Sequence, residues 1–532
     1  MDAAEAPRAA RGDGKRALDL LRDGEPGWAI LTLAAGLPVA LAAWLLLAPG
    51  RVVMEFGVTD FLFNLAGGWQ VLNGRIQHID FHEPVGPVTF WLTALGYHVV
   101  GPTPFAMVVG ETIACAMLSV AAMLAAGRRL ALVPAVIFVL FAALPAIMPF
   151  NMGERLNSYS FAVAYNRYGW GAIGILALVL FIPPRGRRTG VWPDLLLALL
   201  LLIALFYTKI TYFLVGLAMV GVALLVAGHV REARSGWGLV LVLAVANALA
   251  PHSHPYIADI HRHLSSGATP LGPGMFLGVI FSNGPECSLY GMMAVTALML
   301  WRHGLVPLRV PVAMGTLPVA GLALLSLNTQ VQGLPLGVVG LFVLYVAIAG
   351  QIGPGRVIPA TPVLLALLLT PAMASGTIAL SLAGYWRLAS QPAALWPVER
   401  SNLRDLALSG AVAFNPTQSR YISSLIEITD LFAATGAAGR IQLIDRVNPL
   451  PFMLGEPPPR GGDLWWDSDF PLRPPAEILG DADHVVLAKK PARLLPAGIH
   501  ARYLPYIEAN FPHRMETASW IVYSRLPPPP SR

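Results

Sequence analysis

Residues 27–49 read GWAILTLAAGLPVALAAWLLLAP, an apolar stretch without a charged side chain. A helix that crosses the hydrocarbon core of a bilayer needs about 20 such residues, so this stretch is long enough to span. Charged residues make up only 12% of the 532-residue chain and hydrophobic residues 55%. A soluble globular domain carries roughly 25% charged residues. The composition therefore excludes a set of soluble domains, and we predict an α-helical polytopic membrane protein.

Further apolar runs follow this first one as far as residue 384. Charged residues are sparser in this part of the chain than in the segments before and after it. Together these runs predict about eleven transmembrane helices in a membrane domain at residues 27–384. The runs cover residues 27–49, 104–127, 130–149, 169–184, 192–207, 211–228, 237–250, 276–301, 310–327, 333–350 and 358–382.

Basic residues gather in short clusters at the ends of these runs, which is the pattern that sets orientation in a membrane. Residues 1–26 are basic and lack a small-residue cleavage site, so we expect a cytoplasmic N-terminal segment and a retained first span. Counting crossings then predicts a multi-pass protein of a bacterial-type inner membrane. The net charge of +6 is explained by this topology, and no nucleic-acid partner is expected. The segments predicted to lie outside are residues 51–103, 150–168, 251–275, 328–332 and 385–532.

The tail has ordinary charge density and alternates strand-like runs with a helical stretch near residues 419–435. The runs at 440–445, 484–488 and 519–523 predict a small extracytoplasmic α/β domain at residues 385–526. The proline-rich end, residues 527–532, is predicted to be disordered. The two cysteines, Cys115 and Cys287, both fall in or beside apolar segments, so no disulfide framework is expected in the tail.

The first outside loop, residues 51–103, is too long for a plain connector, and loops of this length are usually functional. It contains the acids Glu55, Asp60, Asp80 and Glu83. Apolar residues at helical spacing predict a helix over residues 60–73 that lies along the membrane surface, with Asp60 at or near its N-cap. Asp60 therefore has two interpretations, a helix cap or a catalytic carboxylate.

The same loop places Asp60, Gly74, Asp80, Gly86-Pro87 and Phe90-Trp91 in order along the chain. In this it resembles the first-loop signature of GT-C membrane glycosyltransferases, a class that includes protein O-mannosyltransferases and the aminoarabinose transferases that modify lipid A. The resemblance extends to a lysine in a short break between spans and to a polar loop ending in Leu-Pro before a late span. One departure is Val85, which stands where a lysine follows the first-loop glutamate in the aminoarabinose transferases. The residues that carry the resemblance are Asp60, Gly74, Asp80, Gly86-Pro87, Phe90-Trp91, 206–211 with Lys209, and 328–335.

The resemblance implies a polyprenyl-phosphate sugar donor and transfer, with inversion, to a hydroxyl of an envelope glycan, lipid or protein on the extracytoplasmic side. Asp60 would then be the general base that accepts the hydroxyl proton. The leaving phosphate would need cations near it. Membrane lipids are further expected partners. No cofactor is expected, although a divalent metal is an alternative.

Candidate binding residues come from the outside loops and the break near residue 209. For the sugar or acceptor we select Asp80, Glu83, His82, Tyr165 and Trp170, because carboxylates can orient hydroxyls and aromatic rings can stack on a sugar. The alternative is a purely structural role: Asp80 and Glu83 would cap turns, and His82 would lie on the surface. For the donor phosphate we select Lys209, Arg155, Arg167 and Arg262, with snorkelling to the interface as the alternative for Lys209.

Two further features leave alternatives open. Residues 251–263 hold four histidines and an aspartate, which could bind a metal, but a His-rich interfacial loop explains them more simply. Glu111, inside the second span, is expected to face the bundle interior. The competing functions are a polymerase or ligase of lipid-linked oligosaccharides, a lipid-glycan transporter or flippase, and a scaffold for envelope assembly.

Overall fold

The computed structural model describes most of the chain. The predictions for residues 1–26 and for the end of the tail after residue 527 lie outside the described residues. The described ranges are 27–185, 190–265, 273–328, 333–351, 357–398, 400–409, 416–466, 472–490, 495 and 498–527.

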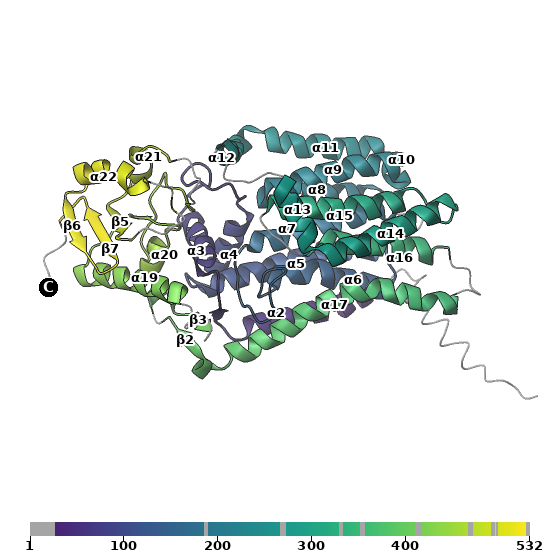
Figure 1. Cartoon of the computed structure of the whole chain (residues 1–532), viewed down its shortest axis with the longest axis horizontal. Coiled ribbons are helices and arrows are strands. Elements are labelled where there is room, and N and C mark those ends of the chain that lie inside the picture. The colour runs from purple at the N-terminus through teal and green to yellow at the C-terminus, as the bar shows by residue number, and fades with distance from the viewer. Residues whose placement is uncertain are drawn as a thin grey trace, which may run out of the picture.

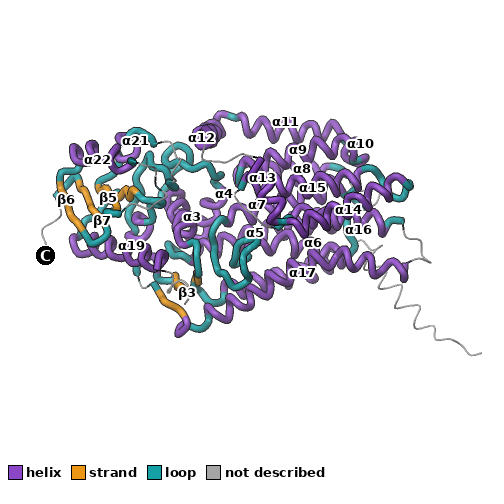
Figure 2. The backbone as a smooth tube through the Cα atoms, viewed as in Figure 1, coloured by secondary structure: helices purple, strands orange, loops and turns teal. Residues whose placement is uncertain are grey.

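Long helices lie side by side in a bundle, and the strands gather at one end of it (Figures 1 and 2). Each predicted apolar run is helical, and Asn283 divides the run at 276–301 into two helices. The bundle consists of α2 (Trp28–Leu47), α5 (Phe105–Gly127), α6 (Leu132–Ala143) with η2 (Leu144–Ile147), α7 (Ala164–Phe181), α8 (Trp192–Thr208), α9 (Ile210–Val226), α10 (Gly228–Glu232), α11 (Arg234–Leu249), α13 (Pro273–Ser282), α14 (Gly284–Arg302), α15 (Arg309–Leu327), α16 (Pro335–Ala349) and α17 (Val357–Ala389).

Large apolar side chains on the outside of the bundle explain why it belongs in a membrane. Leu33 and Leu37 on α2 are each 71% exposed, and an apolar surface of this kind is typical of a face that contacts lipid or another protein. Within the described residues, four helices are long and apolar enough to cross a bilayer, or five if the bent pair α11 and α12 is one span. A multi-pass helical membrane protein is thus supported, and the number of about eleven spans stays a prediction.

The first loop forms two helices that pack against the end of the bundle, α3 (Val58–Leu72) and α4 (Val88–Val100). The predicted helix at 60–73 is present as α3, and its position along the membrane surface stays a prediction. Most of α3 is buried, and its Trp69 Nε1–H donates to the tail carbonyl of Glu456 at 2.9 Å. Its N-cap is Gly57, which has a left-handed backbone with φ of 72°. Asp60 therefore lies in the first turn and is not the N-cap.

The tail forms a four-stranded sheet in the order β4-β5-β7-β6, with one parallel pair, β4 and β5. The predicted strands and the predicted helix near 419–435 are confirmed, and β6 was not predicted. The elements are α19 (Pro416–Thr435), β4 (Ile441–Ile444), α20 (Leu450–Leu454), α21 (Pro475–Leu479), β5 (His484–Ala488), α22 (Ile499–Asn510), β6 (His513–Glu516) and β7 (Trp520–Ser524).

A second, three-stranded sheet joins the first loop to the start of the tail. Strand β1 (Val52–Met54) of the loop pairs in parallel with β3 (Leu406–Ser409), and β2 (Leu395–Pro397) pairs with β3 in the antiparallel sense. The short helices η5 (Pro392–Ala394) and η6 (Ser401–Leu403) lie beside it in the chain. Strands β1 and β3 are hydrogen-bonded neighbours, so the first loop and the start of the tail lie together. The side of the membrane on which they lie stays a prediction.

Candidate functional site

The start of α3 places Asp60 at the end of the bundle. A Cβ on Gly57 would lie 2.8 Å from Ser160 Oγ and 3.2 Å from the Ala162 Cβ, so only glycine fits this tight, left-handed turn. The turn directs Asp60 into the first turn of the helix. Backbone N–H groups at a helix N-terminus favour a negative charge there. Local geometry thus holds a carboxylate where the second outside loop, around residue 160, meets the first.

Two opposing effects act on the Asp60 carboxyl. Burial raises its pKa, and the positive charge of Arg446 lowers it. Burial has the larger effect, so the pKa of Asp60 lies above its ordinary value. Arg446 follows β4 in the tail, and its guanidinium carbon lies 4.4 Å from the centre of the Trp465 ring. Arg446 was not among the predicted site residues. The available signal was its position after a parallel strand, because the carboxyl ends of such strands are where sites form.

The break between α8 and α9 contributes Lys209, whose backbone is extended while both neighbouring helices end beside it. The first loop packs directly onto this break. The Gly86 N–H donates to the Thr208 carbonyl at 3.2 Å, and a Cβ on Gly86 would lie only 2.1 Å from the Tyr207 carbonyl oxygen. Lys209 Nζ lies 5.2 Å from the centre of the Tyr165 ring. Glycine at position 86 is therefore what allows the loop and the lysine to meet.

Glu83 of the first loop lies within electrostatic reach of Lys209 and of two acids from other segments. Burial raises the pKa of Glu83 well above its ordinary value, Asp463 and Asp259 raise it further, and Lys209 opposes them. Its Oε2 has no hydrogen-bond partner among the described residues. The Tyr165 hydroxyl feels the charges of both Asp60 and Glu83.

The structure therefore brings together five residues from four parts of the chain, which we call the Asp60 cluster: Asp60, Glu83, Tyr165, Lys209 and Arg446.

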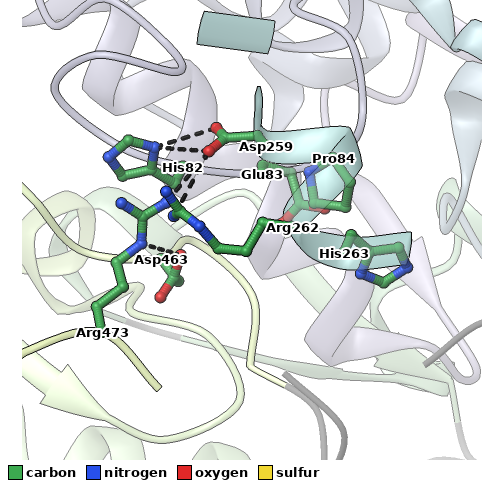
Figure 3. A pocket seen from close by; sticks show the side chains of 8 residues that line it. All are labelled: His82, Glu83, Pro84, Asp259, Arg262, His263, Asp463 and Arg473. Carbon is green, nitrogen blue, oxygen red and sulfur yellow. Dashed lines mark hydrogen bonds and ion pairs between the residues drawn. The ribbon is translucent and has the colours of Figure 1, made fainter. Parts of the chain in front are cut away.

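A second group of charges, the Asp259 hub, lies beside Glu83 and ties three segments together (Figure 3). Asp259, on α12 (His254–Ser265), contacts His78 Nδ1 at 2.9 Å and His82 Nδ1 at 3.0 Å, both from the first loop. Arg473 of the tail donates to the same carboxylate at 3.1 Å. Burial raises the Asp259 pKa, but the bonds to both histidines outweigh it and hold the pKa below its ordinary value. The hub encloses a cavity of about 10 Å³, room for one water molecule.

The predicted sugar-binding residues lie in different places. Glu83 and Tyr165 belong to the Asp60 cluster, and His82 belongs to the Asp259 hub. Asp80 accepts a hydrogen bond from the Ile76 N–H at 2.8 Å and pairs with Arg460 at 3.3 Å, so it caps a turn and holds the tail. Trp170 is buried inside the bundle, where its ring packs edge-on against Tyr212 with centroids 5.5 Å apart.

The predicted phosphate-binding residues are also divided. Lys209 is in the Asp60 cluster, Arg262 lies 3.7 Å from Asp259 and is 39% exposed, and Arg155 is exposed on the second outside loop. Arg167 is buried and pairs with Glu111 at 2.6 Å, and it also donates to the Met148 carbonyl. Glu111 thus faces the bundle interior as expected. We do not carry Arg167 into the proposed phosphate site, because its charge is already paired.

The histidines of residues 251–263 have separate partners. His252 bonds the Tyr207 hydroxyl at 3.0 Å, and His254 bonds the Leu249 carbonyl at 3.0 Å. In the part of the chain that the structure describes, no group of three or more His, Cys, Asp or Glu side chains is placed to hold a metal ion. The two interactions agree with the simpler interpretation of this segment.

The fold and the site define a helical membrane protein with a partly buried cluster of acids and bases where its first loop, a helix break and its tail meet. Two solved structures that resemble the chain are those of ArnT from Cupriavidus metallidurans. The apo structure aligns at a TM-score of 0.47 with 14% identity, over 92% of this chain and 97% of that one. The structure bound to undecaprenyl phosphate aligns at 0.44 with 14% identity, over 93% and 98%.

No protein-family model and no curated protein matches the sequence. Both TM-scores are below 0.5, and we therefore base the function on the site itself.

Proposed function

We propose that this protein is a membrane glycosyltransferase that moves a sugar from a polyprenyl-phosphate donor to a hydroxyl of an acceptor on the extracytoplasmic side. The observation that carries the proposal is the Asp60 cluster. It combines a carboxylate of raised pKa with a partly buried lysine at the end of the bundle reached by the tail. The first-loop resemblance supports the donor class.

In the proposed reaction the acceptor oxygen attacks the anomeric carbon of the sugar while the bond from that carbon to the phosphate oxygen breaks. Asp60 takes the proton of the attacking hydroxyl. A general base works best when its pKa approaches the working pH, and burial moves Asp60 in that direction. Attack opposite the leaving group inverts the configuration, and the products are the glycosylated acceptor and polyprenyl phosphate.

Lys209 is the proposed partner of the donor phosphate. A lysine in a low-dielectric setting is costly without an anion. Among the described residues, Glu83 acts on Lys209 as an opposing charge, and burial holds Glu83 toward its neutral form. A phosphate would supply the missing negative charge. Neutral Glu83 could then donate a hydrogen bond to a sugar hydroxyl, and the Tyr165 ring, 5.2 Å from Lys209 Nζ, could pack against the sugar.

The proposal is tested with Asp60→Asn in purified full-length protein, by following release of polyprenyl phosphate from polyprenyl-phosphate sugars in detergent. Asparagine keeps the shape but cannot accept the proton, so we expect turnover to fall by about 100-fold or more. Asp430→Asn is the control, because Asp430 is an exposed acid far along the chain, paired with Arg400.

Full activity of the Asp60→Asn protein would overturn the role of Asp60. Failure of the unmodified protein to release polyprenyl phosphate from any such donor would overturn the proposed reaction.

A further inference from the structure

A separate polar cavity of about 290 Å³ opens at the outer end of α17, beside the second sheet. Four segments supply its walls: the residue after β1, the second outside loop, the last turn of α17 and the end of β3. Its polar lining consists of Glu55, Asn157, Tyr159, Arg387, Gln391 and Ser409.

The segments that carry this lining are held firmly. The Glu55 N–H donates to the Tyr159 carbonyl at 2.7 Å, and β1 pairs with β3 through Met54 and Leu408. A Cβ on Gly384 would lie 2.9 Å from the Tyr159 hydroxyl oxygen, so the glycine leaves room for that hydroxyl at the cavity wall. The cavity walls are thus held in place by the backbone contacts between the first outside loop, the second outside loop and the tail.

Several polar groups of the lining have unused hydrogen-bonding capacity. Ser409 is only 7% exposed, yet its Oγ has no partner in the described part of the chain. Glu55 and Arg387 both act electrostatically on the Tyr159 hydroxyl, but no ion pair between described residues joins them to each other. Buried polar groups are normally satisfied. An acid, a base and hydroxyls facing one space fit a ligand with many hydroxyl groups.

The position of the cavity indicates how such a ligand arrives. Trp44 and Trp386 pack at 6.1 Å between ring centroids and are 53% and 36% exposed. Exposed tryptophans at helix ends mark the level of the lipid head groups. Arg387 follows Trp386 directly, and Leu380, two turns earlier, is exposed as a lipid-facing residue is. The cavity therefore lies at head-group depth, beside the outer leaflet.

We propose that this cavity binds the saccharide head group of a lipid in the outer leaflet, and that this lipid is the acceptor of the transfer. Its volume is at the lower end of ligand pockets, which begin at roughly 300 Å³, and so suits one sugar ring. Glu55 accepts hydroxyl hydrogens, and Arg387 donates to hydroxyl or phosphate oxygens. Glu55 is five residues before Asp60, so their Cα atoms are at most about 18 Å apart. The acceptor role rests on the proposed function, whereas saccharide binding does not.

The test measures binding without any donor, in full-length protein in nanodiscs. Gln391→Cys places a thiol on an exposed part of the lining, and its rate of alkylation is followed. Protein with Gln391 intact gives the background from Cys115 and Cys287. The probes are dodecyl maltoside, free maltose at the same concentration, and dodecyl dimethylamine oxide, an amphiphile without a sugar. We expect dodecyl maltoside alone to slow alkylation, by about tenfold.

Variants link the protection to the proposed contacts. Glu55→Gln and Arg387→Gln should each abolish it, and Arg400→Gln, a change of an exposed arginine on the tail, should leave it intact. Equal protection by maltose would show that the cavity needs no lipid chain on its ligand. It would overturn the proposal that the saccharide belongs to a lipid and would assign the site to a soluble glycan. Protection by the sugar-free amphiphile, or by none of the probes, would overturn saccharide binding. If dodecyl maltoside protects the thiol, but protein that releases polyprenyl phosphate never transfers the sugar to a saccharide-bearing lipid, only the acceptor role is overturned.

Discussion

Asp259→Asn should loosen the contact between the first loop, α12 and the tail. The carboxylate accepts from His78, His82 and Arg473 at 2.9 to 3.1 Å, and its side chain is only 5% exposed. Asparagine keeps one acceptor oxygen, loses the charge and turns an N–H group toward at least one of these donors. The three segments would then lose the anion that holds them together.

The free energy lost in Asp259→Asn depends on which partners of Arg473 remain in the variant. Removing one partner of a buried ion pair costs about 3–5 kcal/mol. Arg473 keeps two other anions, Asp463 at 3.1 Å and Glu477 at 2.6 Å, so its charge is not left unpaired. We therefore expect a loss at the lower end, about 3 kcal/mol. That loss corresponds to a roughly 100-fold increase in the population in which the segments have separated.

Backbone hydrogen exchange measures this population directly, because amides bridge the two segments. The Gly461 N–H donates to the Asp80 carbonyl at 2.7 Å, and the Leu464 N–H donates to the His82 carbonyl at 3.0 Å. Protection of both amides should fall about 100-fold in Asp259→Asn.

The matched control is Asp430→Asn, whose partner Arg400 lies 3.0 Å away in an exposed pair. Exposed pairs contribute at most about 1 kcal/mol, so the Gly461 and Leu464 amides should keep their protection in this variant. If Asp259→Asn left them as protected as the control does, the hub would not hold the segments together.

Three more predictions follow from other contacts. Gly86→Ala places a Cβ where the Tyr207 carbonyl oxygen lies, so it should push the first loop off the helix break and lower both the thermal midpoint and the rate of transfer. Glu111→Gln leaves Arg167 buried without its anion, which should cost about 3–5 kcal/mol in unfolding measured in detergent; replacing both residues by Leu should recover much of that loss. Burial raises the pKa of Asp60 and the base must be ionised, so transfer should fall as the solution is acidified through that raised pKa; a rate that stays constant down to about pH 4 would contradict this assignment.

The helices and most tail strands could be predicted because their signals are local. An apolar run is helical in lipid because every backbone group must be satisfied within the segment. The apolar runs located the helices. Short strand-like runs located the tail strands β4, β5 and β7. Local reasoning of this kind failed for β1, a three-residue strand whose partner β3 is about 350 residues away. Nothing in three residues identifies a partner at that distance.

The candidate site divides in the same way. Asp60 was selected from the first-loop resemblance, Glu83 and Lys209 because ionisable groups beside apolar runs are usually functional, and Tyr165 because an aromatic ring can stack on a sugar. The caps and ion pairs of Asp80 and Arg167 could not be separated from catalytic roles by composition alone. Their partners, Arg460 and Glu111, are distant in the chain.

The sequence by itself determined that the chain is a helical membrane protein with an acidic first loop, because hydrophobicity and charge are properties of each segment. Only the tertiary structure decided that the charge of Arg446 acts on Asp60, that Asp259 joins the first loop to the tail, and that Glu55 shares a cavity with Arg387. These relations depend on desolvation and distance between charges. Both quantities are defined only once the chain has folded and remote segments exclude water from one another.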